Sequence, residues 1–308
     1  MSVATLAVVV TCAAVGLVYL VARAVARLVC VPPDRDATVL FARGIGPTMT
    51  AVAFALGVVL PAFLLFEPPH DGERGGVVLL ALAAVGAVHL VQIAVRALRM
   101  IGLSRALTER WLATATPLTH EPWGIATFAI DAGFPVVAVG GLLRPRLFVD
   151  RQVLAACSPD ELEAIAEHER AHVLRRDNLR RLLIGACDGP MGAVASAWRE
   201  AAERAADADA ATSPRRAVDL ASALLKLARV APTRTLECTV LSTIHDGGLL
   251  ETRVRHLVSL TCTAPVQAQP PRAALLVLLP AAVAIGLNFP ALLRSAHALT
   301  EAAVRHLP

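Results

Sequence analysis

The sequence predicts a predominantly α-helical membrane protein, in which four transmembrane helices accompany a cytoplasmic α+β domain with a small sheet. Of its 308 residues, 56% are hydrophobic and 18% are charged, so the chain is more apolar than a typical soluble protein. The apolar excess is concentrated in four stretches without charged residues. The region between the third and fourth stretches is charged enough to form an ordinary globular domain.

The four apolar stretches are each about 20 residues long, enough to cross a bilayer core as a helix. They cover residues 3–22, 44–66, 75–95 and 273–293. The first lacks a positively charged start and exceeds the apolar length of a signal peptide, so we interpret it as an uncleaved span. The last contains Pro280, Asn288 and Pro290. A hydrophobic helix packed within the protein is the alternative interpretation, because length alone does not distinguish the two.

Arginines beside the predicted spans indicate their orientation. They follow the first and third spans, at Arg23, Arg27, Arg35, Arg43, Arg96, Arg99, Arg105 and Arg110. Because positive residues stay on the cytoplasmic side, we expect both chain ends outside. The chain then divides into three spans in residues 1–95, a cytoplasmic domain in 96–272, and a fourth span with a short extracellular tail in 273–308.

Two polar residues, His89 and Gln92, lie inside the third predicted span. Such residues can form a proton path or a hydrogen bond between helices, and we expect the hydrogen bond. The net charge of +4 gives no support for direct nucleic-acid binding. The six cysteines form no CxxC pair, so we expect no metal or redox role for them.

The cytoplasmic region combines strand and helix patterns. Residues 123–149 are rich in Val, Ile and Phe and are broken by glycines and prolines, which predicts two or three short strands with tight turns. Ser158, Pro159 and Glu161 then form a capping box that begins a helix. Two further helices are predicted around residues 198–211 and 214–230.

The capped helix carries the pattern HExxH at His168, Glu169 and His172. Residues four apart lie on one helix face, so both imidazoles can bind a single tetrahedral zinc ion. Glu169 is the candidate general base, since a carboxylate beside the metal can take a proton from the attacking water. The alternative is an amphipathic helix with incidental histidines. Glu163 and Glu167 are predicted to be solvated.

A third ligand is expected, because catalytic zinc usually has three protein ligands. The best candidate is Glu203, one helical turn before Asp207, and Glu200 is the competitor. Asp207 would then orient a ligating imidazole.

Several segments resemble the BlaR/MecR-type integral-membrane zinc metallopeptidases (Peptidase_M56) and, more distantly, the HtpX-type membrane proteases. They are GGLLRPRLFV at 140–149, SPDELEAIAEHERAHVLRRDNL at 158–179, ExxxD at 203–207, DLASALLKLA at 219–228 and TRVRHLV at 252–258. The resemblance implies a zincin-like (HExxH) domain with one Zn²⁺ per chain. It implies His168, His172 and Glu203 as ligands, Glu169 as the base, and Asp177 and Asp207 as supporting residues.

The resemblance also has a limit. The antibiotic-sensing members have a large extracellular penicillin-binding domain after their last span, whereas about 15 residues follow the fourth predicted span here. We therefore expect that this chain does not sense a β-lactam with a domain of its own.

The function expected from these features is that of a membrane-anchored zinc endopeptidase acting on proteins at the cytoplasmic membrane face. The resemblance suggests a transcriptional repressor as the substrate, in a signalling pathway. The alternatives are an HtpX-like protease for membrane-protein quality control and a non-catalytic receptor or scaffold. A substrate would pair with an edge strand in residues 125–139. The arginines after the zinc helix (Arg175, Arg176, Arg180 and Arg181) either contact lipid or, as we expect, form a solvated face.

Overall fold

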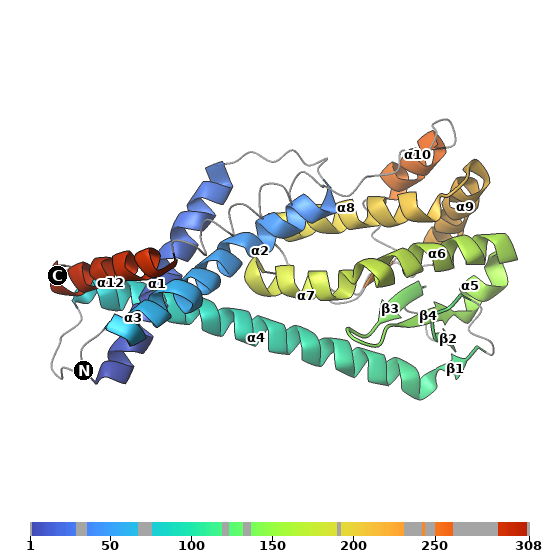
Figure 1. The fold of residues 1–308 in the computed structure, drawn as a ribbon. Coiled ribbons are helices and arrows are strands. Elements are labelled where there is room, and N and C mark those ends of the chain that lie inside the picture. Colours follow the sequence, from blue (N-terminus) through green and yellow to red (C-terminus); the bar gives the residue numbers. More distant parts are fainter. Residues whose placement is uncertain are drawn as a thin grey trace. The chain divides into compact units, whose positions relative to one another are not determined.

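The computed structural model describes residues 2–28, 36–66, 76–118, 123–131, 137–189, 192–230, 242–243, 250–260 and 289–306 (Figure 1). The chain divides into two compact units. The first comprises Met1–Val31, Arg43–Ala94 and Gln267–Pro308, and the second comprises Pro32–Ala42 and Val95–Val266.

Long apolar helices dominate the first part of the chain. Helix α1 spans Val3–Leu28, and α4 spans Val77–Thr114. Between them, α2 (Ala37–Phe54) continues through the π-helix η1 (Ala55–Val59) into α3 (Leu60–Phe66). Within the described residues, three helices are long and apolar enough to cross a membrane: Val3–Leu28, Ala37–Phe66 and Val77–Thr114. They coincide with the first three predicted spans, although α4 continues well beyond the predicted end at residue 95.

The fourth predicted span, at residues 273–293, lies mostly outside the described residues. The structure describes the chain again from Phe289, where α12 (Phe289–His306) begins. This helix is not among the candidate spans found in the described part of the chain. The segment predicted as a short tail after residue 293 is therefore helical as far as His306.

Helices α1 and α4 approach each other closely at two glycines. A Cβ atom on Gly86 would lie 2.0 Å from the carbonyl oxygen of Cys12, and one on Gly16 would lie 2.3 Å from that of Leu82. These separations leave no room for a side chain, so the glycines set the distance between the helices.

The polar residue His89 connects helices within the same unit. Its Nε2 atom lies 3.1 Å from Oγ1 of Thr48 on α2, and its ring stacks on Tyr19 of α1 with centroids 3.6 Å apart. The predicted hydrogen bond between helices is thus confirmed for His89. Gln92, in contrast, is exposed on α4.

The second unit contains a five-stranded sheet of order β1-β2-β4-β3-β5. Its strands are β1 (Thr116–Pro117), β2 (Thr127–Ile130), β3 (Val137–Gly140), β4 (Arg146–Asp150) and β5 (Ser242–Thr243). Strands β2 and β4 are parallel, and the other pairs are antiparallel. The predicted strands within residues 123–149 are confirmed as β2, β3 and β4.

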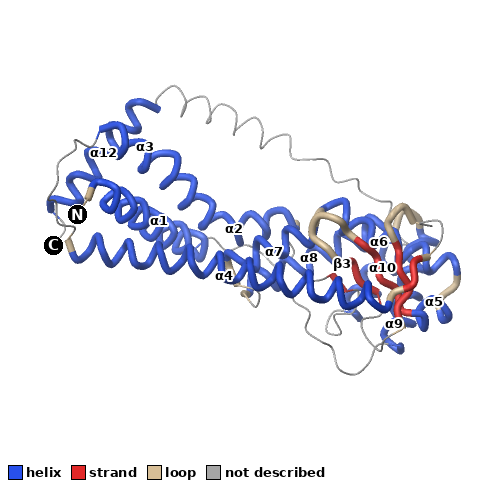
Figure 2. Tube along the Cα trace, turned by 90° about the horizontal axis from the view of Figure 1, so that it is seen from below, coloured by secondary structure: helices blue, strands red, loops and turns tan. Residues whose placement is uncertain are grey.

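Both faces of the sheet are buried. Val137 and Val139 join the core with Ile165 of α6, whereas Ala138 between them packs with Trp111 near the end of α4. Successive side chains of a strand point to opposite faces, so the continuous apolar sequence of β3 fits a strand covered on both sides. Figure 2 shows the red strands beside the helices of this unit.

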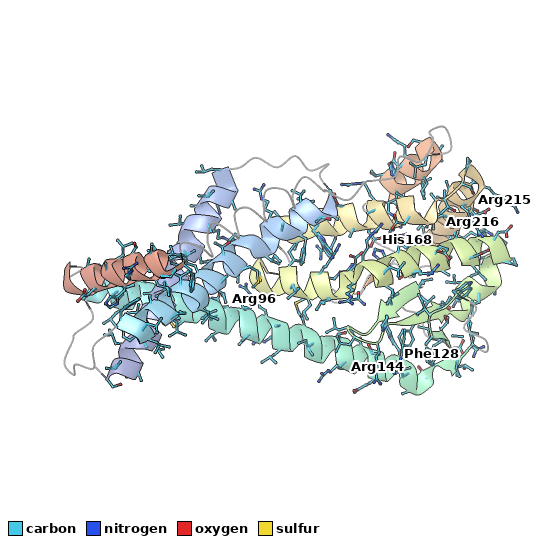
Figure 3. All side chains as sticks on the ribbon, in the orientation of Figure 1. Arg96, Phe128, Arg144, His168, Arg215 and Arg216 are labelled. Carbon is cyan, nitrogen blue, oxygen red and sulfur yellow. The ribbon has the colours of Figure 1, made fainter. Side chains whose placement is uncertain are left out.

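The second unit also contains six further described helices. They are α5 (Arg151–Ala156), α6 (Pro159–Arg175), α7 (Asp177–Cys187), α8 (Ala193–Ala210), α9 (Pro214–Val230) and α10 (Leu250–Leu260). The capping box at Ser158 is present as predicted. Ion pairs link α9 to the start of α6, at Arg215–Asp160 (2.7 Å) and Arg216–Glu163 (2.6 Å). Figure 3 labels the two arginines. Arg176 adopts a left-handed conformation (φ 56°), which separates α6 from α7.

Candidate active site

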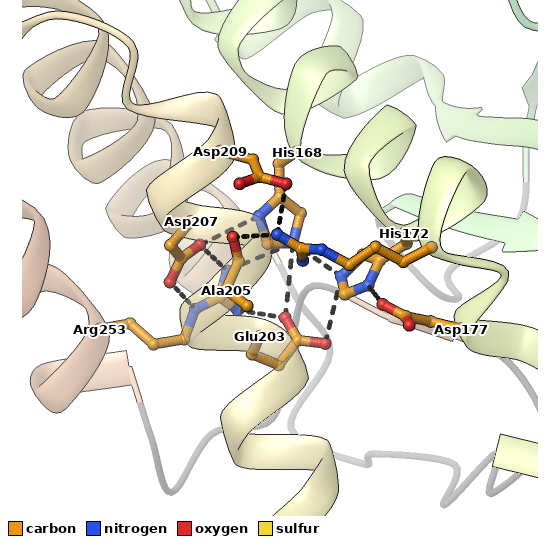
Figure 4. Close-up of polar contacts among 9 residues, drawn as sticks. His168, His172, Asp177, Glu203, Ala205, Asp207, Asp209 and Arg253 are labelled. Carbon is orange, nitrogen blue, oxygen red and sulfur yellow. Dashed lines mark hydrogen bonds and ion pairs between the residues drawn. The ribbon is translucent and has the colours of Figure 1, made fainter. Parts of the chain in front are cut away.

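Helix α6 brings the two histidines of the HExxH pattern together. His168 and His172 are 0% and 3% exposed, and their Nε2 atoms lie 3.2 Å apart. Ala164 and Ile165 anchor the helix in the core formed with the sheet and α9. The exposed Glu163 and Glu167 lie on the outer face, as predicted. The helix therefore directs both imidazoles toward α8 (Figure 4).

Helix α8 supplies the carboxylate of Glu203. Its Oε2 lies 3.4 Å from Nε2 of His168, and its Oε1 lies 3.5 Å from Nε2 of His172. The three candidate ligand atoms lie within 4.8 Å of one another. Glu200 is not part of this group, which was found within the described residues. Two imidazoles and one carboxylate form a donor set that suits zinc.

Two aspartates contact the Nδ1 atoms of the histidines, on the side of each ring away from Glu203. Nδ1 of His172 lies 2.8 Å from Oδ2 of Asp177, and Nδ1 of His168 lies 3.0 Å from Oδ1 of Asp207. Asp177 can accept a hydrogen bond from Nδ1–H of His172, and Asp207 lies within ion-pair distance of Nδ1 of His168, which leaves Nε2 of each ring as the ligand atom. Thus the structure brings Asp177 and Asp207 to the positions at which supporting residues were predicted.

Glu169 lies between the two histidines in sequence and is completely buried. Within the described residues, neither of its carboxylate oxygens has a hydrogen-bond partner. Burial raises the pKa of Glu169 above its usual value. A buried carboxylate without partners is costly, and the cost is offset where the group faces a metal or a polar substrate. The residues present therefore fit a zinc ion.

Neighbouring cations keep the buried acidic groups of the site ionised. Burial opposes ionisation of Glu203, but His172 and Arg253 outweigh it and hold the pKa of Glu203 well below its usual value. Burial likewise opposes ionisation of Asp207, but His168 and Arg253 lower its pKa. For His172, burial is outweighed by Glu203 and Asp177, which raise its pKa to about 10. The site thus pairs two carboxylates with cationic side chains.

Arg253 on α10 also enters the site, although the sequence analysis assigned it no role. It is 4% exposed and contacts both Asp207 and Glu203. The signal was present in the helical spacing of residues 250–260, where Arg253 and Leu257, four apart, are buried and Arg255 is exposed. Helical spacing alone, however, does not show which charged residue will be buried on the apolar face of a helix.

The arginines after the HExxH pattern do not form the solvated face that was expected. Arg175 donates to the carbonyl oxygen of Ala205 and pairs with Asp209 on α8. Arg181 is 7% exposed, and burial lowers its pKa. Only Arg176 is exposed in the predicted way. Acidic residues on α8 and burial within the helix layer account for the difference.

A pocket of about 340 Å³ adjoins His172. Its lining includes Val139, Leu142, Leu143 and Pro145, from β3 and the turn that follows it, and Arg176 and Asn178, from the end of α6 and the start of α7. Asn178 donates to the carbonyl oxygens of Val139 (3.0 Å) and Gly141 (3.2 Å), which ties α7 to the end of β3. The site therefore opens beside a largely apolar wall.

The edge strands of the sheet differ from the expectation for substrate pairing. The outer edge of β2 is paired with β1, and the outer edge of β3 is paired with β5. A substrate strand could not add to β2 or β3 at these residues without displacing a two-residue neighbour. The predicted edge within residues 125–139 is thus covered in this structure.

Residues 112–232 match the family model described as Peptidase family M48. The matched segment contains β1–β4 and α5–α9, and with them the two histidines, Glu169 and Glu203. A search of curated proteins finds no match. The BlaR/MecR-type assignment is not confirmed, because the matching model is that of family M48.

Proposed function

We propose that the protein is an HtpX-like membrane zinc endopeptidase for quality control of membrane proteins, because residues 112–232 match the model of Peptidase family M48 and contain the candidate zinc ligands. The observation that carries the proposal is the buried His168–His172–Glu203 group beside the unpartnered carboxylate of Glu169. Three candidate membrane helices in the same chain support action at a membrane.

The proposed reaction is hydrolysis of a peptide bond. His168, His172 and Glu203 would hold the zinc, which would supply a Lewis acid that polarises the substrate carbonyl and increases the acidity of a water molecule. Glu169 would accept the proton of that water at its carboxylate and pass it to the nitrogen of the leaving amine. Burial suits this role, because it brings the pKa of a carboxylate closer to neutrality than in water.

The surrounding carboxylates would keep the ligands in place. Asp177 and Asp207 would hold the Nδ1–H tautomers of His172 and His168, so that each Nε2 keeps its lone pair directed at the metal position. The pocket beside His172 would accept an apolar side chain against Leu142 and Leu143. Such a site fits an extended, unfolded segment of a membrane protein better than a folded surface.

The catalytic domain would lie in the cytoplasm. Arginines follow the first and third spans predicted from the sequence, and by the positive-inside rule the N-terminus would then lie outside. In inverted membrane vesicles, we expect added protease to reach the domain, and in spheroplasts we expect it to be protected. The opposite pattern would reverse the orientation without affecting the chemistry.

Substitution of the proposed base tests the function. Purified full-length Glu169→Gln protein should keep one zinc per chain. Its rate of cleavage of an unfolded protein such as casein should fall by a factor of about 10² to 10⁴. The matched control is Glu167→Gln on the same helix, at an exposed position, and it should retain activity. Casein cleavage by Glu169→Gln at the rate of the unmodified protein would overturn the proposal.

Cleavage of a transcriptional repressor is the second candidate function, since it follows from the BlaR/MecR-type resemblance. Protein fragments can be compared between cells that carry the active protein and cells that carry Glu169→Gln. A broad set of membrane-protein fragments would support quality control. A single cleaved repressor would support signalling.

A further inference from the structure

Arg253 lies outside the matched segment 112–232, and its side chain contacts the group of candidate zinc ligands. Its Nε donates to Oδ2 of Asp207 at 2.8 Å, and its Nη2 donates to Oδ1 of the same carboxylate at 2.6 Å. Its Nη1 lies 3.1 Å from Oε2 of Glu203. One guanidinium thus contacts two carboxylates of α8 (Figure 4).

The fork geometry fixes the plane of the Asp207 carboxylate. Two parallel hydrogen bonds from a planar guanidinium leave a carboxylate little freedom to rotate. The same Oδ1 of Asp207 lies 3.0 Å from Nδ1 of His168. The orientation of the His168 ring therefore depends on Arg253 through Asp207.

Arg253 acts on Glu203 directly. Glu203 and Asp207 lie one helical turn apart and are 6% and 0% exposed, so their negative charges repel each other without water to screen them. A cation that touches both carboxylates removes this repulsion. A lysine ammonium would keep the charge but could not make all three contacts, because it is a compact point charge.

We propose that Arg253 is a positioning residue that aligns His168 and Glu203 for zinc, so that α10 completes a metal site otherwise built from α6 and α8. The proposal rests on the zinc peptidase function proposed above. The competing explanation is that Arg253 only attaches α10 to the rest of the unit. That role would affect stability but not the intrinsic affinity for zinc.

Zinc titration of the full-length protein in detergent separates these explanations. We expect Arg253→Lys to weaken zinc binding by about 10- to 100-fold, the range for residues that orient metal ligands. Arg255→Gln is the matched control, because Arg255 lies on the same helix and pairs with Glu251 at the surface. It should bind zinc as the unmodified protein does. An unchanged dissociation constant for Arg253→Lys would overturn the proposal, even if its melting temperature falls.

A second variant tests the route through Asp207. In an Asp207→Asn background, Arg253→Lys should weaken zinc binding by less than it does alone. The carboxylate that accepts two hydrogen bonds from the guanidinium is already absent in that background. Full additivity would show that Arg253 does not act through Asp207 and would overturn that step. If the unmodified protein bound no zinc, the proposed function itself would fail. Zinc binding that is equal in the unmodified protein and Arg253→Lys would reject only the role of Arg253.

Discussion

The two compact units bury histidine in different ways. In the second unit, His168 and His172 are surrounded by Asp177, Glu203 and Asp207, and every one of these carboxylates is nearly inaccessible to water. In the first unit, His89 is 6% exposed but contacts a hydroxyl group and a stacked tyrosine ring. Burial alone therefore does not indicate a metal ligand. The charge of the neighbouring side chains distinguishes the candidate metal site from a contact between helices.

The largest difference between the histidines should follow from removing a charged partner. Asp177→Asn keeps the shape of the side chain but weakens the hydrogen bond that holds His172 at 2.8 Å. We expect zinc affinity to fall by about 10- to 100-fold, measured by competition with a chelator. Asp209→Asn is the control, because Asp209 lies on α8 at the surface and its side chain is 58% exposed. Equal affinities for the two variants would contradict the comparison.

The first unit should instead be sensitive to the distance between its helices. Gly86→Ala would place a Cβ atom 2.0 Å from the carbonyl oxygen of Cys12, so α1 and α4 must separate. We expect a loss of about 1–3 kcal/mol of stability, measured by denaturation in detergent, with unchanged zinc affinity.

The control for this substitution is Gly46→Ala on α2, where nothing lies within 4 Å of the added atom. It should be neutral or slightly stabilising, because alanine favours helix more than glycine does. Loss of zinc affinity in Gly86→Ala would contradict this expectation, because it would show that the membrane helices influence the metal site.

Features set by interactions between residues close in sequence can be predicted from it, and features set by distant residues cannot. The capping box and the HExxH pattern are set by residues within one or two helical turns, so both could be predicted. Glu203 could be selected by its ExxxD pattern, but its approach to His168 required the packing of α6 on α8. Arg253 reaches Asp207 across 46 residues of sequence, and the helical spacing that distinguishes it from the exposed Arg255 does not identify its partner.

Arg181 and the membrane boundaries show the same limit. The run of arginines after the HExxH pattern suggests a solvated surface. In the structure, however, Arg175 pairs with Asp209 of another helix, and Arg181 is buried. Hydropathy located the first three spans but not the end of α4, since the helix continues into the second unit with polar residues. The fourth span remains a prediction from hydropathy.

The charged networks of the second unit should respond to acid. Glu161 accepts hydrogen bonds from Ser222 (2.6 Å) and Lys226 (2.7 Å). Burial opposes its ionisation, but Lys226 and Ser222 lower the pKa of Glu161 to about 2. Because the pKa is depressed on folding, the stabilisation is complete above the unfolded value of about 4.3 and is lost as the pH falls through 2.

Glu161→Gln should therefore cost about 1–2 kcal/mol at pH 7, and its melting temperature should approach that of the unmodified protein as the pH falls toward 2. Glu163→Gln, at a position whose side chain is 49% exposed, is the control and should have a smaller effect. A difference for Glu161→Gln that does not change with pH would assign the effect to packing instead of charge.

The smallest effect is expected where the partner of a buried histidine is neutral. Thr48→Val preserves the volume of a side chain that is 2% exposed and removes only the hydroxyl group 3.1 Å from Nε2 of His89. Hydrogen bonds between membrane helices contribute about 0.6 kcal/mol on average, and His89 would keep its stacking on Tyr19. Denaturation in detergent should therefore show a small loss of stability, and zinc affinity should not change. A loss of zinc affinity as large as that of Asp177→Asn would mean that His89 belongs to the same functional network as His172, because a local contact between helices could not produce it.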